Sequence, residues 1–133
     1  MNITASISSR QAHHTVLVTT NGNEKTISIP SKSEGKGSSV NGGELLFLAL
    51  ATCFCNDVYR EATKRNMQVA SVEISVTGSF GGEGEPAQAI SYTASVLAPD
   101  HSVEEIESLI RHVDGIAEVH NTLRKGIAVS LHQ

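Results

Sequence analysis

The sequence predicts a single α+β domain, residues 1–133, in which mostly antiparallel strands surround one long buried helix. Three observations predict this class. Runs of alternating apolar and polar residues fall into one group before and one group after a long apolar segment. An Asn-Gly pair joins two of the early runs, and shorter helical patterns follow the late ones. A chain of this length has room for one hydrophobic core.

Three short strands are expected in the N-terminal part. Apolar residues alternate with polar ones over residues 3–7, which is typical of a half-buried strand. Two β-rich runs, 15–20 and 24–29, flank the Asn-Gly pair at 21–22, the strongest short signal for a hairpin. The third strand ends at a proline. The Gly/Ser-rich residues 31–43 lack periodicity and are expected to form a mobile loop.

A long helix is expected to follow this loop. Asn41 and Glu44 have the spacing of a capping box, and the helix is expected to reach about residue 65, roughly 35 Å away at 1.5 Å per residue. Residues 45–55 are apolar on every side, which is typical of complete burial. One small domain has too little other chain to cover such a helix. We therefore expect a partner subunit, in a homodimer.

The C-terminal half predicts a hairpin, two helices and a last strand. Ser102 and Glu105 have capping-box spacing and open a helix with one apolar face, which is expected to break at Gly115. The expected strands are 72–76, 90–96 and 127–131, and a short helix is expected at 117–125.

Composition and motifs exclude several classes of function. The net charge of −4, the lack of a lysine/arginine cluster and the absence of tryptophan argue against a nucleic-acid partner. The longest apolar run, 45–51, is too short to cross a bilayer, and no secretory signal is evident, so no membrane partner is expected. Glycine-rich nucleotide motifs are missing, and no cofactor is expected. His13 and His14 would point to opposite faces of a strand, so no metal site is expected.

The two cysteines, Cys53 and Cys55, lie on opposite faces of the predicted helix. Successive helical residues are about 100° apart, so these thiols cannot pair, and a reduced, cytoplasmic setting is expected. Cys55 shares its face with apolar residues and is typical of a buried, inert thiol. Cys53 lies where the apolar half of the helix meets the polar half. Its face comprises Leu46, Ala49, Leu50, Asn56, Asp57 and Arg60.

A reactive Cys53 would need its thiolate stabilised. It lies more than two turns from the helix start, beyond the reach of the helix dipole. A positive side chain from elsewhere in the chain is therefore required. Arg10, Arg60 and His120 are the candidates, and periodicity does not choose between them.

The segment 42–54, Gly-Gly-Glu-Leu-Leu-Phe-Leu-Ala-Leu-Ala-Thr-Cys-Phe, resembles the central-helix motif of the OsmC/Ohr family of osmotically inducible and organic hydroperoxide resistance proteins. That motif has Pro-Glu-Glu-Leu-Leu, small residues and Ala-Cys-Phe, and the two align without a gap. Residues 72–76 and 119–129 are similar to later parts of the family's chain, so the resemblance covers nearly the whole sequence. It implies an OsmC-like fold and an intertwined homodimer with two sites at its interface.

The resemblance also implies an activity. Active members of the family are thiol peroxidases that reduce organic hydroperoxides. The central-helix cysteine attacks the peroxide to give a sulfenic acid, and a second cysteine forms a disulfide that a dithiol such as dihydrolipoamide reduces. By motif position, Cys53 would be the peroxidatic thiol. Arg10, in the loop after the first strand, would match the arginine that stabilises the thiolate.

Two positions depart from the family pattern. Alignment on Asn121 places Ala117 where the family has its second cysteine. The glutamate that pairs with the arginine aligns with Gly43, while Glu44 takes the next position and is expected to cap the helix. The other cysteine of this chain faces away from the peroxidatic one. A peroxidase here would therefore use one cysteine, and an external thiol would reduce its sulfenic acid.

Two functions follow as hypotheses. The first is OsmC-like reduction of organic hydroperoxides in oxidative stress defence, with Cys53 as nucleophile, Arg10 as electrostatic partner and a small hydrophobic peroxide as substrate. The second is a non-catalytic OsmC-like dimer that binds a small apolar molecule or senses redox state, which the missing second cysteine favours. The expected pocket-lining residues are Leu50, Glu44, Asp57, His120 and Asn121.

Overall fold

The computed structural model describes residues 1–132 and confirms the predicted α+β class. Its elements are three strands, one long helix, two strands and two shorter helices, in that order. The chain divides into two compact units, residues 1–45 and the remainder from residue 46, each with its own antiparallel sheet. None of the described helices has the length and apolar character needed to cross a membrane.

The first unit is a sheet with the strand order β1-β2-β3. Its strands are β1 (Ile3–Arg10), β2 (His13–Thr20) and β3 (Asn23–Thr26). Between β2 and β3, Asn21 and Gly22 both have positive φ, 48° and 81°, as a two-residue type I′ hairpin requires. The predicted hairpin is confirmed, although β3 ends at residue 26 rather than 29.

β1 departs from the half-buried strand that its alternation predicts, because all of its residues are exposed. Ile3 and Ile7 leave 62% and 59% of their surface in contact with solvent. These side chains share one face of the strand. β1 therefore presents an apolar stripe that the rest of the first unit leaves uncovered.

The helix α1 (Gly42–Lys64) begins as predicted. The amide of Asn41 donates to Glu44 Oε2 at 2.8 Å, and the amide of Glu44 donates to Asn41 Oδ1 at 2.9 Å, so the capping box is present. Leu48 is 60% exposed, so the second unit does not bury α1 on every side, although the apolar sequence of the helix predicts this. The helix instead buries a single stripe made of Leu50, Phe54, Asp57, Val58, Glu61 and Ala62.

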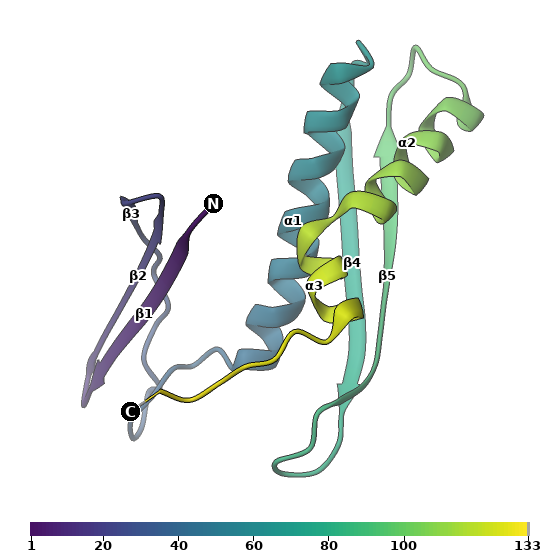
Figure 1. Ribbon diagram of the computed structural model, residues 1–133. Coiled ribbons are helices and arrows are strands. Elements are labelled where there is room, and N and C mark those ends of the chain that lie inside the picture. Colours follow the sequence, from purple (N-terminus) through teal and green to yellow (C-terminus); the bar gives the residue numbers. More distant parts are fainter. Residues whose placement is uncertain (133) are drawn as a thin grey trace. The chain divides into compact units, whose positions relative to one another are not determined.

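The second unit packs three helices against one face of a two-stranded sheet (Figure 1). The strands β4 (Ser71–Phe80) and β5 (Ala87–Leu97) pair antiparallel, and the helices are α1, α2 (Val103–Ile116) and α3 (Glu118–Lys125). The buried core consists of Phe54, Val58, Ala62, Met67, Ala98, Leu109, Val113 and Ala117. Alternate strand side chains pack against it: Val72, Ile74, Tyr92, Ala94 and Val96.

The ends of the two C-terminal helices follow their local signals closely. Ser102 and Glu105 form the predicted capping box, with hydrogen bonds of 2.8 and 3.2 Å. Gly126, in the left-handed region with φ 62°, ends α3. The break expected at Gly115 is wrong by one residue, because the amide of Ala117 still donates to the carbonyl of Val113 and α2 runs on to residue 116.

The strand predicted at 127–131 is wrong, because residues 127–132 form no strand. A strand needs a neighbour to take its backbone hydrogen bonds, and no strand in the described chain pairs with this segment. Ile127, Val129 and Leu131 are accordingly 61%, 99% and 85% exposed.

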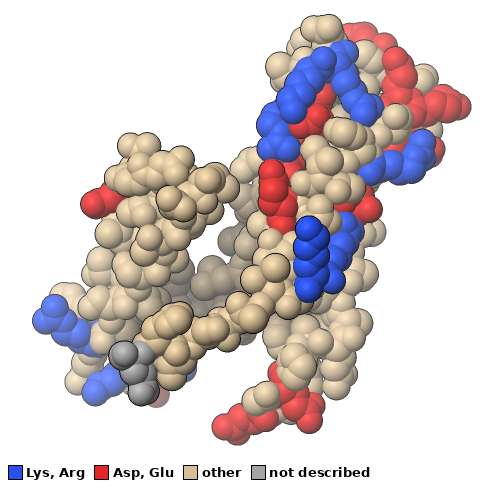
Figure 2. Space-filling view, viewed as in Figure 1, with Lys and Arg blue, Asp and Glu red and all other residues tan. Residues whose placement is uncertain are grey.

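Acidic and basic side chains lie interspersed over the helical part of the second unit (Figure 2). Glu61 is buried on α1 and accepts hydrogen bonds from Lys64 at 2.7 Å and from Arg60 at 3.0 Å. His112 Nε2 lies 3.2 Å from the second carboxylate oxygen of Glu61, Oε2. Lys64 and Arg60 are the main causes that lower the pKa of Glu61 to about 2.

Candidate functional site

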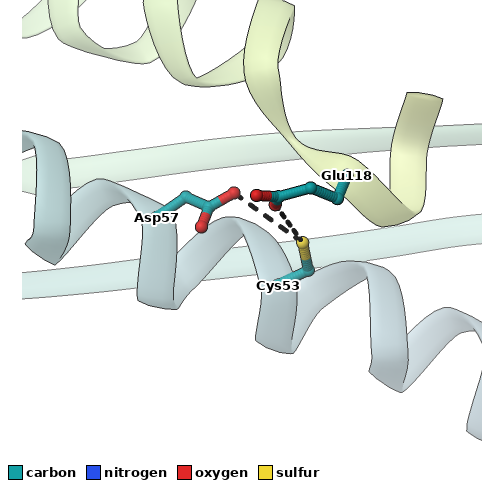
Figure 3. Close-up of side chains that lie close together, drawn as sticks. All are labelled: Cys53, Asp57 and Glu118. Atoms are coloured by element: carbon teal, nitrogen blue, oxygen red, sulfur yellow. Dashed lines mark hydrogen bonds between the residues drawn. The ribbon is translucent and has the colours of Figure 1, made fainter. Parts of the chain in front are cut away.

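The thiol of Cys53 faces two carboxylates, whose oxygens point toward one another (Figure 3). Its Sγ is 3.7 Å from Asp57 Oδ2 and 3.8 Å from Glu118 Oε2, which are distances of weak S–H···O hydrogen bonds. Asp57 lies one turn further along α1, as their shared helix face predicts. Glu118 is the first residue of α3 and stands 65 positions further along the chain. One thiol and two acids thus meet from two helices.

The joint between α2 and α3 brings Glu118 to the thiol. Ala117 ends one helix and begins the next, with extended backbone at φ −61° and ψ 110°. Its side chain is fully buried in the core against which Cys53 packs. Because only a methyl group occupies this position, the first turn of α3 can begin close to α1.

The pKa of the Cys53 thiol is raised above its ordinary value. Burial is the largest cause, because a low-dielectric surrounding disfavours the thiolate. The backbone N–H of Val119 lowers the pKa by donating to the sulfur, while the negative charges of Asp57 and Glu118 raise it further. Cys53 is therefore held as a neutral thiol at neutral pH.

Asp57 also has a raised pKa, first through burial and then through the nearby charge of Glu118. Arg60 opposes this shift, because its Nη1 lies 2.7 Å from Asp57 Oδ1. The Arg60 side chain is 44% exposed, so solvent screens part of its charge. Asp57 thus uses one oxygen for an arginine and the other for the Cys53 thiol.

The structure locates the three cations that the sequence offered for Cys53. Arg60 binds Asp57 and Glu61 instead of the sulfur. Arg10 lies at the end of β1, paired with His13 of β2, in the first unit. His120 lies on α3 and is buried.

His120 fills an aromatic part of the core. Its ring packs edge-on against Tyr92, with centroids 4.7 Å apart, and tilted against Phe54 at 5.6 Å. Neither ring nitrogen has a hydrogen-bond partner among residues 1–132. Burial and then the charge of Arg124 lower the pKa of His120. His120 is therefore neutral at neutral pH and does not supply the cation.

Asn121 joins the last two helices. Its Nδ2 donates to the carbonyl of Gly115 at 3.0 Å, and its Oδ1 accepts from Arg124 at 3.2 Å. Arg124 also pairs with Asp114 at 2.6 Å, and the Tyr92 hydroxyl donates to the same carboxylate. Asn121 thus has its polar atoms engaged in holding α3 on α2.

The other predicted residues lie apart from the thiol's polar contacts. Leu50 is buried in the stripe of α1, and Glu44 is engaged in the helix cap. Cys55 is half-buried rather than a member of the core cluster that its face predicts. It lines a shallow open pocket on the other side of the helix with Ala51, Thr52, Asn56 and Ile74.

Cys53, Asp57 and Glu118 are also the one group of three in residues 1–132 whose donor atoms could share a metal ion, since these atoms lie within 4.8 Å of one another. A thiolate with two carboxylates is a donor set that Zn²⁺ accepts. Sequence spacing did not indicate this set, because Glu118 is remote from the other two. His13 and His14 belong to no such group in the described chain.

Glu118 is the residue that sequence reasoning missed. The alignment on Asn121 placed Ala117 at the second-cysteine position, and Glu118 follows it directly. That adjacency is the signal that could have identified it. The N–H of Val119 carries no such signal, because a backbone donor is independent of residue type.

The sequence model of the family described as OsmC-like protein matches residues 35–132. No curated protein matches the chain at a significant level.

Several solved structures share the fold. An OsmC-like protein from Mycoplasma pneumoniae is 21% identical, with a TM-score of 0.65 over 92% of this chain and 86% of that one. An organic hydroperoxide resistance protein OsmC from Legionella pneumophila is 17% identical, with a TM-score of 0.59 over 98% and 95%. An organic hydroperoxide resistance protein from Elizabethkingia anophelis is 17% identical, with a TM-score of 0.64 over 97% and 92%. At these identities the likeness shows the fold.

Proposed function

We propose, because the chain belongs to the family of OsmC-like proteins, that it reduces organic hydroperoxides at Cys53 with one cysteine and an external thiol. The position of Cys53 carries this proposal. Ala117, where the family resemblance expects a second cysteine, is buried in the core beside it, and Val119 directs a backbone N–H at the sulfur. A preorganised donor of this kind stabilises negative charge on sulfur during attack.

The names of two structural neighbours support the substrate class. The proteins from Legionella pneumophila and Elizabethkingia anophelis are both called organic hydroperoxide resistance proteins. An organic hydroperoxide is accordingly the substrate assigned here, in a role in oxidative stress defence.

The reaction needs one thiol of the protein. The Cys53 sulfur attacks the outer peroxide oxygen, so that an S–O bond forms, the O–O bond breaks and an alcohol leaves. One external thiol condenses with the resulting sulfenic acid and releases water, and a second frees Cys53 as a thiol. Cys55 lies on the opposite side of α1, so it does not condense with the sulfenic acid of Cys53. Arg10 is the cation that the family resemblance implies for the thiolate, while Arg60 binds carboxylates.

The assembly proposed is a cytoplasmic homodimer. Ile7 on β1 and Leu48 on α1 are 59% and 60% exposed within one chain. Exposed apolar surface on a sheet and on a long helix is what a second copy would cover.

The acidic neighbours of Cys53 favour a second function. Asp57 and Glu118 help to keep the thiol protonated, and a neutral thiol reacts slowly with peroxides. A dimer with such a site would bind a small apolar molecule or respond to redox state without turnover.

Consumption of cumene hydroperoxide in the presence of excess dihydrolipoamide tests the first function. The wild-type protein and the matched Cys55→Ser variant should consume it, and Cys53→Ser should not exceed the rate without protein. Equal consumption by all three would reject Cys53 as the nucleophile. No consumption by the wild-type protein would reject the peroxidase and leave the second function.

A further inference from the structure

Glu118 has an exposed carboxylate whose contacts all belong to the Cys53 site. Its Oε2 lies 3.8 Å from Cys53 Sγ, and one of its carboxylate oxygens lies within 4.8 Å of an oxygen of Asp57. It makes no ion pair within residues 1–132, where seven pairs join other acidic side chains to lysine, arginine or histidine. This carboxylate stands in the first turn of α3, and its polar neighbours are the thiol and Asp57.

The carboxylates of Asp57 and Glu118 lie close together beside the thiol. Donor oxygens of Asp57 and Glu118 lie within 4.8 Å of each other and of the sulfur. Burial and then the nearby charge of Glu118 raise the pKa of Asp57, so its carboxylate accepts a proton more readily than an exposed one.

The other charged and titratable groups near this pair do not replace it. On α1, Arg60 holds the far oxygen of Asp57 and leaves the near one to the thiol. On α3, His120 is neutral and Arg124 is bound to Asp114 of α2. Tyr92 of β5 donates its hydroxyl to that same carboxylate. Among these groups, Asp57 and Glu118 alone are hydrogen-bonded to Cys53.

We propose that Asp57 and Glu118 act as a proton relay for Cys53, taking the thiol proton and delivering it to the leaving group of the hydroperoxide. The relay deepens the proposed hydroperoxide reduction and rests on it. One carboxylate accepts the S–H proton as the sulfur attacks the outer oxygen, which keeps its own hydrogen and becomes S–OH. The O–O bond breaks, and the departing alkoxide takes the stored proton and leaves as the alcohol. Sulfur is oxidised, the peroxide is reduced, and the carboxylate pair ends as it began.

This arrangement explains why acids that disfavour the thiolate would stand beside a nucleophilic cysteine. Their charge makes ionisation of the thiol harder. An alkoxide, however, is a poor leaving group, and a positioned proton donor speeds its departure by more than the charge slows the attack. The relay therefore matters for alkyl hydroperoxides. Delivery of the proton does not matter for a peracid, whose leaving carboxylate needs none.

The test compares oxidation rates of Cys53 by two oxidants, tert-butyl hydroperoxide and peracetic acid. The variants are Glu118→Gln, which changes an exposed side chain, and the double variant Asp57→Asn/Glu118→Gln. The relay predicts that the loss of rate in the double variant is on the order of 100-fold greater with tert-butyl hydroperoxide than with peracetic acid. Glu118→Gln should show the same selective loss with a smaller factor. Glu107→Gln, on the exposed surface of α2, is the matched control and should change neither rate.

Alkylation by iodoacetamide distinguishes a proton relay from a merely structural role of Asp57 and Glu118. Alkylation needs the thiolate but no proton for its leaving group. It should therefore become faster at neutral pH in the double variant, whose thiol has lost two negative neighbours. An unchanged or faster reaction with tert-butyl hydroperoxide would overturn the relay, and so would an equal loss with both oxidants. If wild-type Cys53 reacts with neither oxidant faster than Cys55 does, the proposed function itself fails.

Discussion

The carboxylate of Glu118 lies 3.8 Å from the thiol of Cys53, although 65 positions separate the two residues. Together with Asp57, this contact places two acids beside the Cys53 sulfur, and their charges raise the pKa of the thiol. The chemistry of the site depends on how this negative charge is used.

The first prediction concerns the acidity of Cys53. Glu118→Gln removes a negative neighbour and should lower the pKa of the thiol, so that iodoacetamide alkylation at neutral pH becomes faster. The pH dependence of alkylation in a Cys55→Ser background measures this pKa. Glu107→Gln, which pairs with Arg111 on an exposed face of α2, serves as the control. An unchanged or raised pKa in Glu118→Gln would show that the carboxylate does not act on the sulfur.

The second prediction concerns assembly. Leu48 is 60% exposed on a helix whose sequence is otherwise typical of burial, so Leu48→Glu should convert the proposed dimer to a monomer. Val103→Glu changes an apolar residue that is 67% exposed on α2 and should leave the dimer intact. Light scattering coupled to size-exclusion chromatography gives the masses. A monomeric wild-type protein would contradict the assembly proposed here.

The third prediction concerns acid stability. Lys64 and Arg60 lower the folded-state pKa of Glu61 to about 2 from 4.5, so the unfolded chain takes up this proton more readily. The stabilisation is complete above about pH 4.5 and is lost as the pH falls towards 2. Urea unfolding should show Glu61→Gln as less stable than the wild type at pH 7, with the gap closing as the pH falls through this range. A gap that does not vary with pH would contradict these ion pairs.

The fourth prediction concerns the packing of α1 on the sheet. A Cβ atom at Gly78 would clash with the carbonyl of Ala89 and lie 2.7 Å from the Phe47 ring. Gly78→Ala should therefore cost about 1–3 kcal/mol in the free energy of unfolding. Gly82→Ala is the matched control, because nothing lies within 4 Å of its Cβ position. Equal stability of the two variants, measured by urea unfolding, would show that Phe47 does not pack on Gly78.

The helix caps were predictable from the sequence because their signals are local. Asn41 with Glu44 and Ser102 with Glu105 form the two capping boxes at the expected positions. The Asn-Gly pair at 21–22 likewise specified its hairpin. The strand expected at 127–131 depended on a pairing partner that alternation cannot reveal, and this segment forms no strand.

Of the two acids that contact Cys53, one was predictable from the sequence and the other was not. Helical spacing placed Asp57 on the face of Cys53, and the two are in contact. Glu118 reaches the same thiol through the turn at Ala117, which depends on tertiary packing. All-round burial of α1 was not reached within one chain, because the second unit covers only one stripe of the helix.

The oxidation of Cys53 itself tests the central claim most directly. Intact-protein mass spectrometry after one equivalent of cumene hydroperoxide should show rapid, stoichiometric addition of one oxygen atom, lost again on treatment with a dithiol. Peptide mapping should locate this oxygen on Cys53 and not on Cys55. Oxidation of Cys53 no faster than that of Cys55 or of free cysteine would contradict a peroxidatic role.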